Sequence, residues 1–155
     1  MARALKPALP NDQRYSDTLL REILSSVRTI AMPGASVKPE RPSNGVMRFL
    51  QSRGYRVIPV NPGQAGKILL GERVYARLAD IPDKIDMVDI FRNQSALGKT
   101  TDEAIAAGAK VVWMQLGLID EGAAAHAEAA GLAVIMNRCP AIEIPRLFGD
   151  EDPHL

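Results

Sequence analysis

The sequence is poor in cysteine, histidine and aromatic residues. Its 155 residues include one cysteine, Cys139, two histidines, and only three Phe, three Tyr and one Trp. A single cysteine excludes an internal disulfide, which fits a reducing compartment, so the expected location is the cytoplasm. The scarcity of aromatic side chains also excludes a repeated platform on which nucleic-acid bases could stack.

An excess of one charge and long apolar runs are also missing. The 19 basic residues are scattered among 18 acidic ones, which gives a net charge of +1. Because nucleic-acid-binding proteins usually carry a basic stripe, this balance argues against nucleic acid as a partner. No apolar run approaches the ~20 residues that span a bilayer, and the first residues lack the continuous apolar segment of a signal peptide. We therefore expect no membrane association.

The motifs of common catalytic and metal sites are absent as well. The chain has no His-Glu-x-x-His motif, no cysteine and histidine spacing suited to a metal, and no Ser-His-Asp arrangement. His126 lies in an alanine-rich segment and His154 lies near the C-terminus, and neither has an evident partner that would make it a base. Because a hydrolase or transferase needs a nucleophile and a poised base, the sequence predicts a binding protein without catalytic residues.

What the chain does contain is five apolar segments that alternate with helical ones. The expected strands are residues 29–32, 55–60, 87–91, 110–114 and 132–136. Such alternation predicts an α/β, Rossmann-like three-layer fold, in which a five-stranded parallel sheet has helices on both faces. Right-handed crossovers and an anion-binding turn after the first strand favour the strand order 3-2-1-4-5.

The chain is expected to fold as one domain with short extensions, since its length is enough for one sizeable core. Residues 1–28 should form an N-terminal arm and a covering helix, for which Asp12 and Ser16 are both possible N-caps. Residues 29–147 should form the Rossmann-like domain. Residues 148–155 should form a C-terminal tail whose last residues fray.

The segment from Thr29 to Asn61 has the pattern of a strand, a glycine turn, a helix and a second strand. In such a unit, the turn after the first strand faces the N-terminus of the helix, where unpaired N–H groups and the helix dipole attract anions. We therefore predict that a phosphate of an adenine nucleotide binds at the turn around Gly34. The residues alone also leave open a purely structural glycine turn.

The glycine turn does not match the fingerprint of NAD-binding proteins. That fingerprint is G-x-G-x-x-G with an acidic residue near the end of the second strand, whereas Gly34 stands alone and the second strand ends at Asn61. The chain also lacks a P-loop motif. An NAD(P)-dependent oxidoreductase is therefore a disfavoured alternative, and a non-enzymatic interaction scaffold with a vacant nucleotide cleft is another.

Short motifs at the expected strand ends carry a resemblance to a known family. They are Gly34-Ala35-Ser36, Pro39, Arg41-Pro42-Ser43, Gly54-Tyr55-Arg56-Val57-Ile58-Pro59-Val60-Asn61-Pro62, Asp89-Ile90-Phe91-Arg92, Trp113-Met114-Gln115-Leu116-Gly117 and Arg138-Cys139-Pro140. Over roughly residues 29–144 the chain resembles the small stand-alone CoA-binding domain proteins. That family is similar to the CoA-binding domain of the succinyl-CoA synthetase α subunit and of ADP-forming acyl-CoA synthetases. The resemblance implies a protein that binds coenzyme A or acyl-CoA, without established catalysis.

The resemblance also implies which residues surround the ligand. Backbone N–H groups of Gly34, Ala35 and Ser36 would hold a phosphate, and Lys38 and Arg41 would neutralise the remaining phosphate charge. The other residues expected at the nucleotide or at the start of the pantetheine arm are Ser43, Asn61, Pro62, Lys67, Phe91, Arg92 and Gln115. A homo-oligomer or a protein partner is compatible with this assignment.

Some of these residues have structural alternatives, and one position departs from the family pattern. Lys38 and Arg41 can be solvated loop charges, and Arg92 can pair with Asp89 or Asp86. Cys139 is expected to be a small packed side chain, with a mixed disulfide to the thiol of CoA as the alternative. The departure is Pro33, where the family mostly has an aliphatic residue; proline removes one N–H from the turn.

Overall fold

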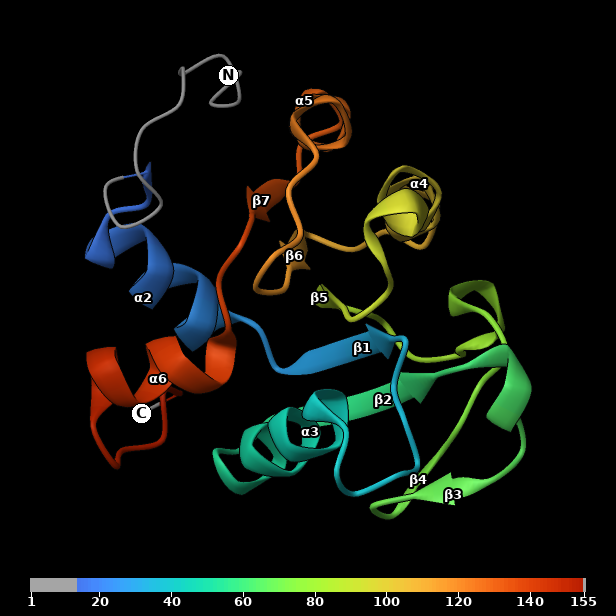
Figure 1. Ribbon diagram of the computed structural model, residues 1–155. Helices are drawn as coiled ribbons and strands as arrows, with labels where there is room; N and C mark the ends of the chain where they lie inside the picture. Colours follow the sequence, from blue (N-terminus) through green and yellow to red (C-terminus); the bar gives the residue numbers. More distant parts are fainter. Residues whose placement is uncertain (1–13, 155) are drawn as a thin grey trace.

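The computed structural model describes residues 14–154 and shows a Rossmann-like α/β fold (Figure 1). The strands of its main sheet are β1 (Thr29–Pro33), β2 (Arg56–Val60), β5 (Met87–Ile90), β6 (Val111–Met114) and β7 (Ala133–Ile135). All neighbouring strands are parallel, and their order is β2-β1-β5-β6-β7. The predicted fold class and the five-stranded parallel sheet are confirmed.

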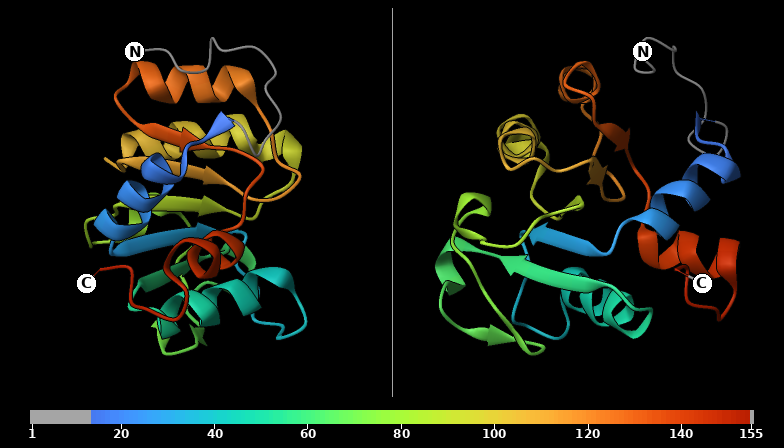
Figure 2. Two further views of the ribbon diagram at one scale, coloured as in Figure 1. Left: turned by 90° about the vertical axis from the view of Figure 1, so that its left-hand side faces the viewer. Right: turned by 180° about the vertical axis from the view of Figure 1, so that it is seen from behind.

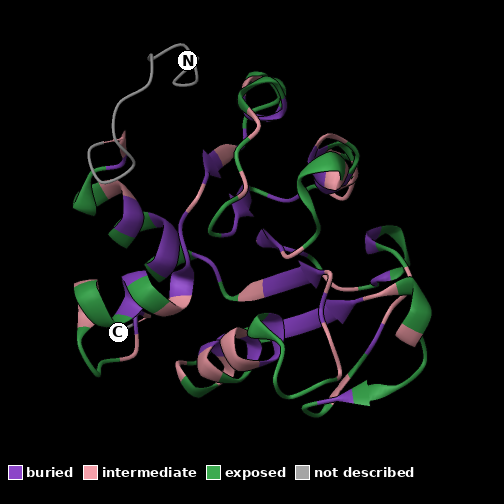
Figure 3. Ribbon diagram, viewed as in Figure 1, coloured by how far each residue is buried: buried purple, intermediate pink, exposed green. Residues whose placement is uncertain are grey.

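Helices cover both faces of this sheet, which makes three layers. The helices are α2 (Asp17–Ser26), α3 (Pro42–Ser52), α4 (Leu97–Ala106), α5 (Glu121–Ala129) and α6 (Pro140–Phe148). In the left view of Figure 2, α2 and α6 lie in front of the sheet and α4 lies behind it. One apolar cluster joins α2, α3 and α6 to the sheet, and another joins α4 and α5 to its other face. The strands are therefore buried on both sides, as Figure 3 shows.

The helices begin at residues that suit a helix N-terminus. The Ser16 hydroxyl accepts a hydrogen bond from the N–H of Leu19 at 3.0 Å and caps α2, whereas Asp12, the other predicted cap, lies outside the described residues. Asp120 caps α5 in the same way. Helices α3 and α6 each begin with a proline, which fits the first helical position because no partner is needed for its missing N–H.

The strand order differs from the predicted order 3-2-1-4-5 at one strand. The third strand was expected outside the second, but β5 pairs with β1 instead, Ile30 lying opposite Met87. To place the third strand outside β2, the chain would need a crossover connection from β2, which usually contains a helix packed on the sheet. The connection over residues 61–86 forms 3-10 turns and a small hairpin of β3 (Ile68–Leu69) and β4 (Glu72–Arg73). It also bridges Tyr75 to Val60, so it occupies the outer edge of β2 and leaves the free edge of β1 to β5.

The end of the described chain is packed, which contradicts the expected fraying. The His154 side chain is 4% exposed. One of its ring nitrogens lies 2.7 Å from the Val27 carbonyl oxygen and the other lies 2.7 Å from a carboxylate oxygen of Asp152. The same ring meets Tyr55 edge to face, with 4.6 Å between the ring centroids. Residues 152–154 therefore cover the junction between α2 and β1.

Candidate functional site

The turn after β1 packs closely against the loop after β5. Gly34 has φ of +86°, and a Cβ atom at this position would lie 2.6 Å from the carbonyl oxygen of Phe91. The N–H of Phe91 in turn donates to the carbonyl of Pro33 at 2.8 Å. Only glycine combines a left-handed backbone with so close an approach of another backbone.

The three backbone N–H groups of this turn are already hydrogen bonded inside the protein. Gly34 donates to the Val60 carbonyl at 3.0 Å, Ala35 donates to the Met32 carbonyl at 3.3 Å, and Ser36 donates to the Ser43 hydroxyl at 3.0 Å. These are the N–H groups that the family resemblance assigns to a phosphate, and their binding of a phosphate stays a prediction. The glycine turn is present, but its N–H groups fix the loop.

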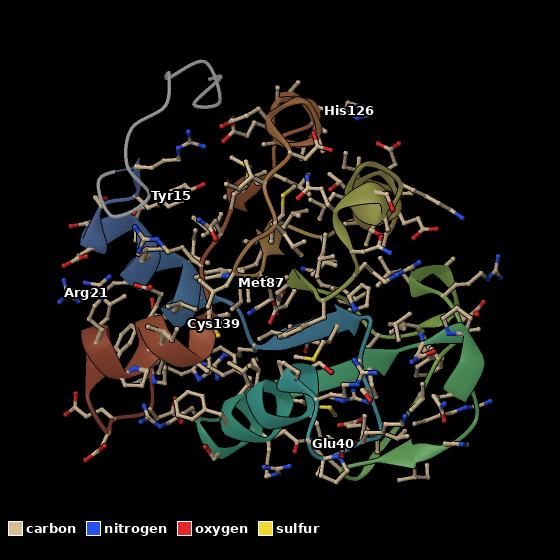
Figure 4. All side chains as sticks on the ribbon, viewed as in Figure 1. Tyr15, Arg21, Glu40, Met87, His126 and Cys139 are labelled. Carbon is tan, nitrogen blue, oxygen red and sulfur yellow. The ribbon has the colours of Figure 1, made fainter. Side chains whose placement is uncertain are left out.

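A pocket of about 360 Å³ lies beside this turn, at the carboxyl edge of the sheet. Its lining residues are Gly34, Ser36, Lys38, Arg41, Pro42, Ser43, Asn61 and Phe91. All of them except Pro42 belong to the predicted site, and they come from the loop between β1 and α3 and from the ends of β2 and β5. Figure 4 labels Glu40 on that loop. The structure thus brings most of the predicted phosphate-side residues together.

The pocket is electropositive. Lys38 and Arg41 are exposed, and within residues 14–154 neither forms an ion pair. Helix α3 begins at Pro42, directly after Arg41, so the positive end of its dipole faces the same space. The N–H of Ser43 lies in the first turn of α3, whose N–H groups have no partner within the helix. An anion can therefore meet two cationic side chains and a helix N-terminus here.

Amide side chains hold the loop in place. Asn61 donates to the carbonyl of Ala35 at 2.8 Å, and its side-chain oxygen accepts from the N–H of Gly63 at 2.9 Å. Asn44, which is buried, donates to the carbonyl of Ser36 at 3.1 Å. Asn44 was not among the predicted site residues, and its adjacency to Ser43 was the available signal. The pocket walls are therefore fixed by contacts across the loop.

The remaining predicted residues do not line this pocket. They are Ala35, Pro62, Lys67, Arg92 and Gln115. Pro62, Lys67 and Arg92 are exposed on the loops after β2 and β5. Arg92 does not pair with Asp86, whose carboxylate instead accepts from the N–H groups of Arg28 and Thr29, both at 3.0 Å. Ala35 is buried and contributes its backbone.

Gln115 is paired with a buried acid, Asp89. In the amide orientation that satisfies both groups, the Gln115 side-chain nitrogen donates to the two carboxyl oxygens of Asp89 at 2.8 and 3.3 Å. Asp89 is fully buried, and this burial raises its pKa well above the ordinary value because the charged form would lose its hydration. The Gln115 amide is therefore engaged inside the sheet, away from the pocket.

We expect Asp89→Asn to raise the free energy of unfolding near neutral pH. A carboxyl group whose pKa is higher in the folded than in the unfolded state stabilises the folded protein. This contribution is complete below about pH 4, near the pKa of the unfolded state, and is lost as the pH rises through the folded pKa. Asparagine has the same shape and does not ionise, so Asp89→Asn should be more stable than the native protein at about pH 8 and should lose that advantage at about pH 4. Urea unfolding of both proteins at about pH 4 and about pH 8 measures it. A difference between the proteins that does not change with pH would contradict the raised pKa.

Two further pockets differ in their position on the sheet. One, of about 370 Å³, lies between the 3-10 turn Leu78–Asp80 and the end of α4, at the amino edge, with Arg77, Asp83 and Glu103 among its lining residues. Ligands of open parallel sheets bind beyond the carboxyl ends of the strands, which disfavours this pocket. The other, of about 420 Å³, adjoins the end of β2 and is lined partly by Tyr75. Tyr75 was not among the predicted site residues, because no periodic signal in the irregular connection after β2 shows that it returns to Val60.

The other reactive side chains lie apart from the pocket. Cys139 is buried at the start of α6, which agrees with a packed small side chain (Figure 4). His126 lies on α5, where it contacts Asp102 at 3.0 Å on the exposed surface. In the described part of the chain, no three His, Cys, Asp or Glu side chains are grouped as metal ligands, and no helix is long and apolar enough to cross a membrane.

Comparison with known proteins gives the family. Residues 28–145 match the family described as CoA binding domain. The chain belongs to this CoA-binding domain family. The predicted resemblance is thereby confirmed, and the matched segment contains the whole sheet, the loop between β1 and α3 and every residue of the predicted site.

The relatives of this CoA-binding domain chain include stand-alone proteins and parts of larger enzymes. An uncharacterized Bacillus subtilis protein, YneT, is 35% identical over 82% of this chain and 93% of its own length. The solved structure of a hypothetical protein from Pyrococcus horikoshii is 41% identical, with a TM-score of 0.84, and covers 94% of this chain and 100% of that one. The ADP-forming acetate–CoA ligase I α subunit of Pyrococcus furiosus is 32% identical over 59% of this chain, but this match spans only 21% of that subunit.

Proposed function

We propose that the protein binds coenzyme A or an acyl-CoA in the pocket between the β1–α3 loop and the ends of β2 and β5. The observation that carries this proposal is the pair Lys38 and Arg41, which line the pocket without a carboxylate partner in the described chain. Membership of the CoA-binding domain family supports CoA as the anion that they meet. We assign no catalytic role to any residue.

The phosphates of CoA suit the charges of this pocket. CoA carries a pyrophosphate and a separate phosphate on its ribose, so it brings several negative charges into one small region. The guanidinium group of Arg41 can bind two phosphate oxygens at once, and the ammonium group of Lys38 acts as a compact charge. The N-terminus of α3 adds the N–H of Ser43. The proposal therefore relies on these side chains and the helix end, and contacts of the ligand with the N–H groups of the glycine turn stay a prediction.

The direction that we propose for the rest of the ligand follows the predicted roles of the strand-end residues. The adenosine group lies toward the end of β2, where Asn61 and Pro62 follow the strand and Tyr75 adjoins it. The pantetheine arm lies toward the end of β5, where Phe91 forms a wall of the pocket. Arg92 and Lys67, both exposed on neighbouring loops, can reach the ligand only from its periphery.

The contacts of Asn61 disfavour the NAD(P)-dependent alternative. NAD-binding folds place a carboxylate near the end of the second strand, where it accepts hydrogen bonds from the ribose. Asn61 occupies this place, and both ends of its amide are engaged, with Ala35 and with Gly63. A cytoplasmic location and a homo-oligomer or protein partner stay predictions from the sequence.

Calorimetric titration of the full chain with CoA and with NAD tests the proposal. We expect saturable binding of CoA and a melting temperature that rises with its concentration, by mass action equivalent to about 2.7 kcal/mol at a hundredfold excess over Kd. NAD at the same concentrations should give neither effect. Equal affinity for NAD, or no heat and no thermal shift with about millimolar CoA, would contradict the proposed function.

A further inference from the structure

Two large aliphatic side chains are exposed on the loop after β6. Leu116 is 55% exposed and Ile119 is 46% exposed, between the end of β6 and the start of α5. Because β1, β5 and β6 are neighbours and parallel, this loop lies about 10 Å, two strand intervals, from the loop after β1. In the left view of Figure 2, both loops lie on the side toward which the arrowheads of β5 and β6 point.

This apolar loop is held by its neighbours on both sides. The N–H of Gly117 donates to the side chain of Asn137 at 2.7 Å. The N–H of Ile119 donates to the side-chain oxygen of Gln94 at 3.2 Å, and the side-chain nitrogen of Gln94 donates back to the carbonyl of Ile119. The loop is therefore tied to the loops after β5 and β7, and its exposed side chains form a fixed surface at the edge where ligands of such sheets bind.

We propose that this loop contacts the acyl chain of a bound acyl-CoA, so that the preferred ligand is a thioester with an uncharged aliphatic chain rather than free CoA. The inference rests on the proposed function, because the phosphates at Lys38 and Arg41 set the direction of the ligand. The pantetheine arm then crosses the ends of β1 and β5 past Phe91, and the thioester end arrives at the loop after β6. Burial of an aliphatic chain against Leu116 and Ile119 removes apolar surface from water.

The composition of the loop after β6 favours one class of acyl group over another. Residues 115–119 read Gln-Leu-Gly-Leu-Ile and carry no charge, and Asp120, which caps α5, follows them. A terminal carboxylate on the acyl chain would find no cation on this loop and would approach the Asp120 carboxylate. The loop therefore fits aliphatic acyl groups and disfavours dicarboxylic ones such as succinyl.

The test is calorimetric titration with CoA, acetyl-CoA, hexanoyl-CoA and succinyl-CoA. The native protein is expected to bind hexanoyl-CoA about tenfold more tightly than CoA, since each buried methylene group adds to affinity. The variant Leu116→Ser/Ile119→Ser should lose this preference and keep the native Kd for CoA. The matched control Ile68→Ser/Ile142→Ser, which changes two exposed isoleucines on the β3–β4 hairpin and on α6, should keep the preference.

Several outcomes would overturn the inference. One is equal affinity of the native protein for CoA and hexanoyl-CoA, and another is tightest binding of succinyl-CoA, which would indicate a cation such as Arg92 at the acyl end. A third is a variant that keeps the preference but changes the oligomeric state in size-exclusion chromatography, because a second copy would then cover this surface. Absence of binding of every CoA species would overturn the proposed function as well, whereas binding of CoA without preference would overturn only this inference.

Discussion

Alanine in place of Gly34 is expected to destabilise the fold by about 2 to 5 kcal/mol. The left-handed backbone disfavours any side chain here, and the new Cβ would lie 2.6 Å from the carbonyl oxygen and 2.7 Å from the carbonyl carbon of Phe91. These are backbone atoms of the loop after β5, so they can move only if β1 and β5 separate at their ends. Equilibrium unfolding in urea, with the slope m compared between the proteins, measures the loss.

Gly45→Ala is the matched control for this substitution. Gly45 lies in α3 and its φ is not in the left-handed region. Apart from its chain neighbours and the backbone of its own helix, no described heavy atom lies within 4 Å of an added Cβ. Because alanine favours helices over glycine, this variant should gain about 0.5 to 1 kcal/mol. A Gly34→Ala variant as stable as the native protein would show that Gly34 does not pack closely against the backbone of Phe91.

Removal of the two pocket cations is expected to weaken CoA binding strongly without affecting the fold. Lys38→Gln and Arg41→Gln should each raise the Kd for CoA about tenfold, and the double variant about a hundredfold, because hydrogen bonds to charged groups are worth about 1.5 to 3 kcal/mol. Both side chains are exposed and form no ion pair in the described chain, so the unfolding midpoint should stay near the native one. Titration calorimetry and urea unfolding of the same preparations measure both quantities.

Charge removal elsewhere separates a local effect from a general one. Arg21, labelled on α2 in Figure 4, and Lys84 are exposed cations outside the pocket, and Arg21→Gln/Lys84→Gln lowers the net charge by the same amount. This control should keep the native Kd. Raising the salt from about 50 mM to about 500 mM should weaken binding to the native protein more than binding to the Lys38→Gln/Arg41→Gln variant. Equal losses in the control and the pocket variant would remove Lys38 and Arg41 from the site.

The fold class follows from the sequence because it depends on local pattern. Apolar runs such as residues 87–91 and 110–114, separated by amphipathic segments, leave few alternatives to a parallel sheet covered by helices. Strand order depends on what fills each edge of the sheet. The position of β5 beside β1 depends on the connection over residues 61–86, which has no long helix and in which Tyr75 bridges to Val60. Short turns of this kind give no periodic signal.

In the candidate site too, features within one loop could be predicted from the sequence, whereas contacts between distant segments could not. The pocket residues from Gly34 to Ser43 lie on one loop, so their proximity could be predicted from their spacing. The partners of the loop N–H groups could not be, because the bond from Ser36 to the Ser43 hydroxyl depends on how the loop closes onto α3. The pairing of Gln115 with Asp89 joins two strands that only the folded sheet makes neighbours.

The most direct test of the account is a crystal structure of the full chain with bound CoA. We expect the pyrophosphate to lie within hydrogen-bonding distance of Lys38 Nζ or the Arg41 guanidinium, beside the first turn of α3. The Gly34, Ala35 and Ser36 N–H groups should keep their contacts within the protein. CoA bound in the pocket between Leu78 and Ala107, or a pyrophosphate held by the N–H groups of the glycine turn with both cations turned away, would contradict it.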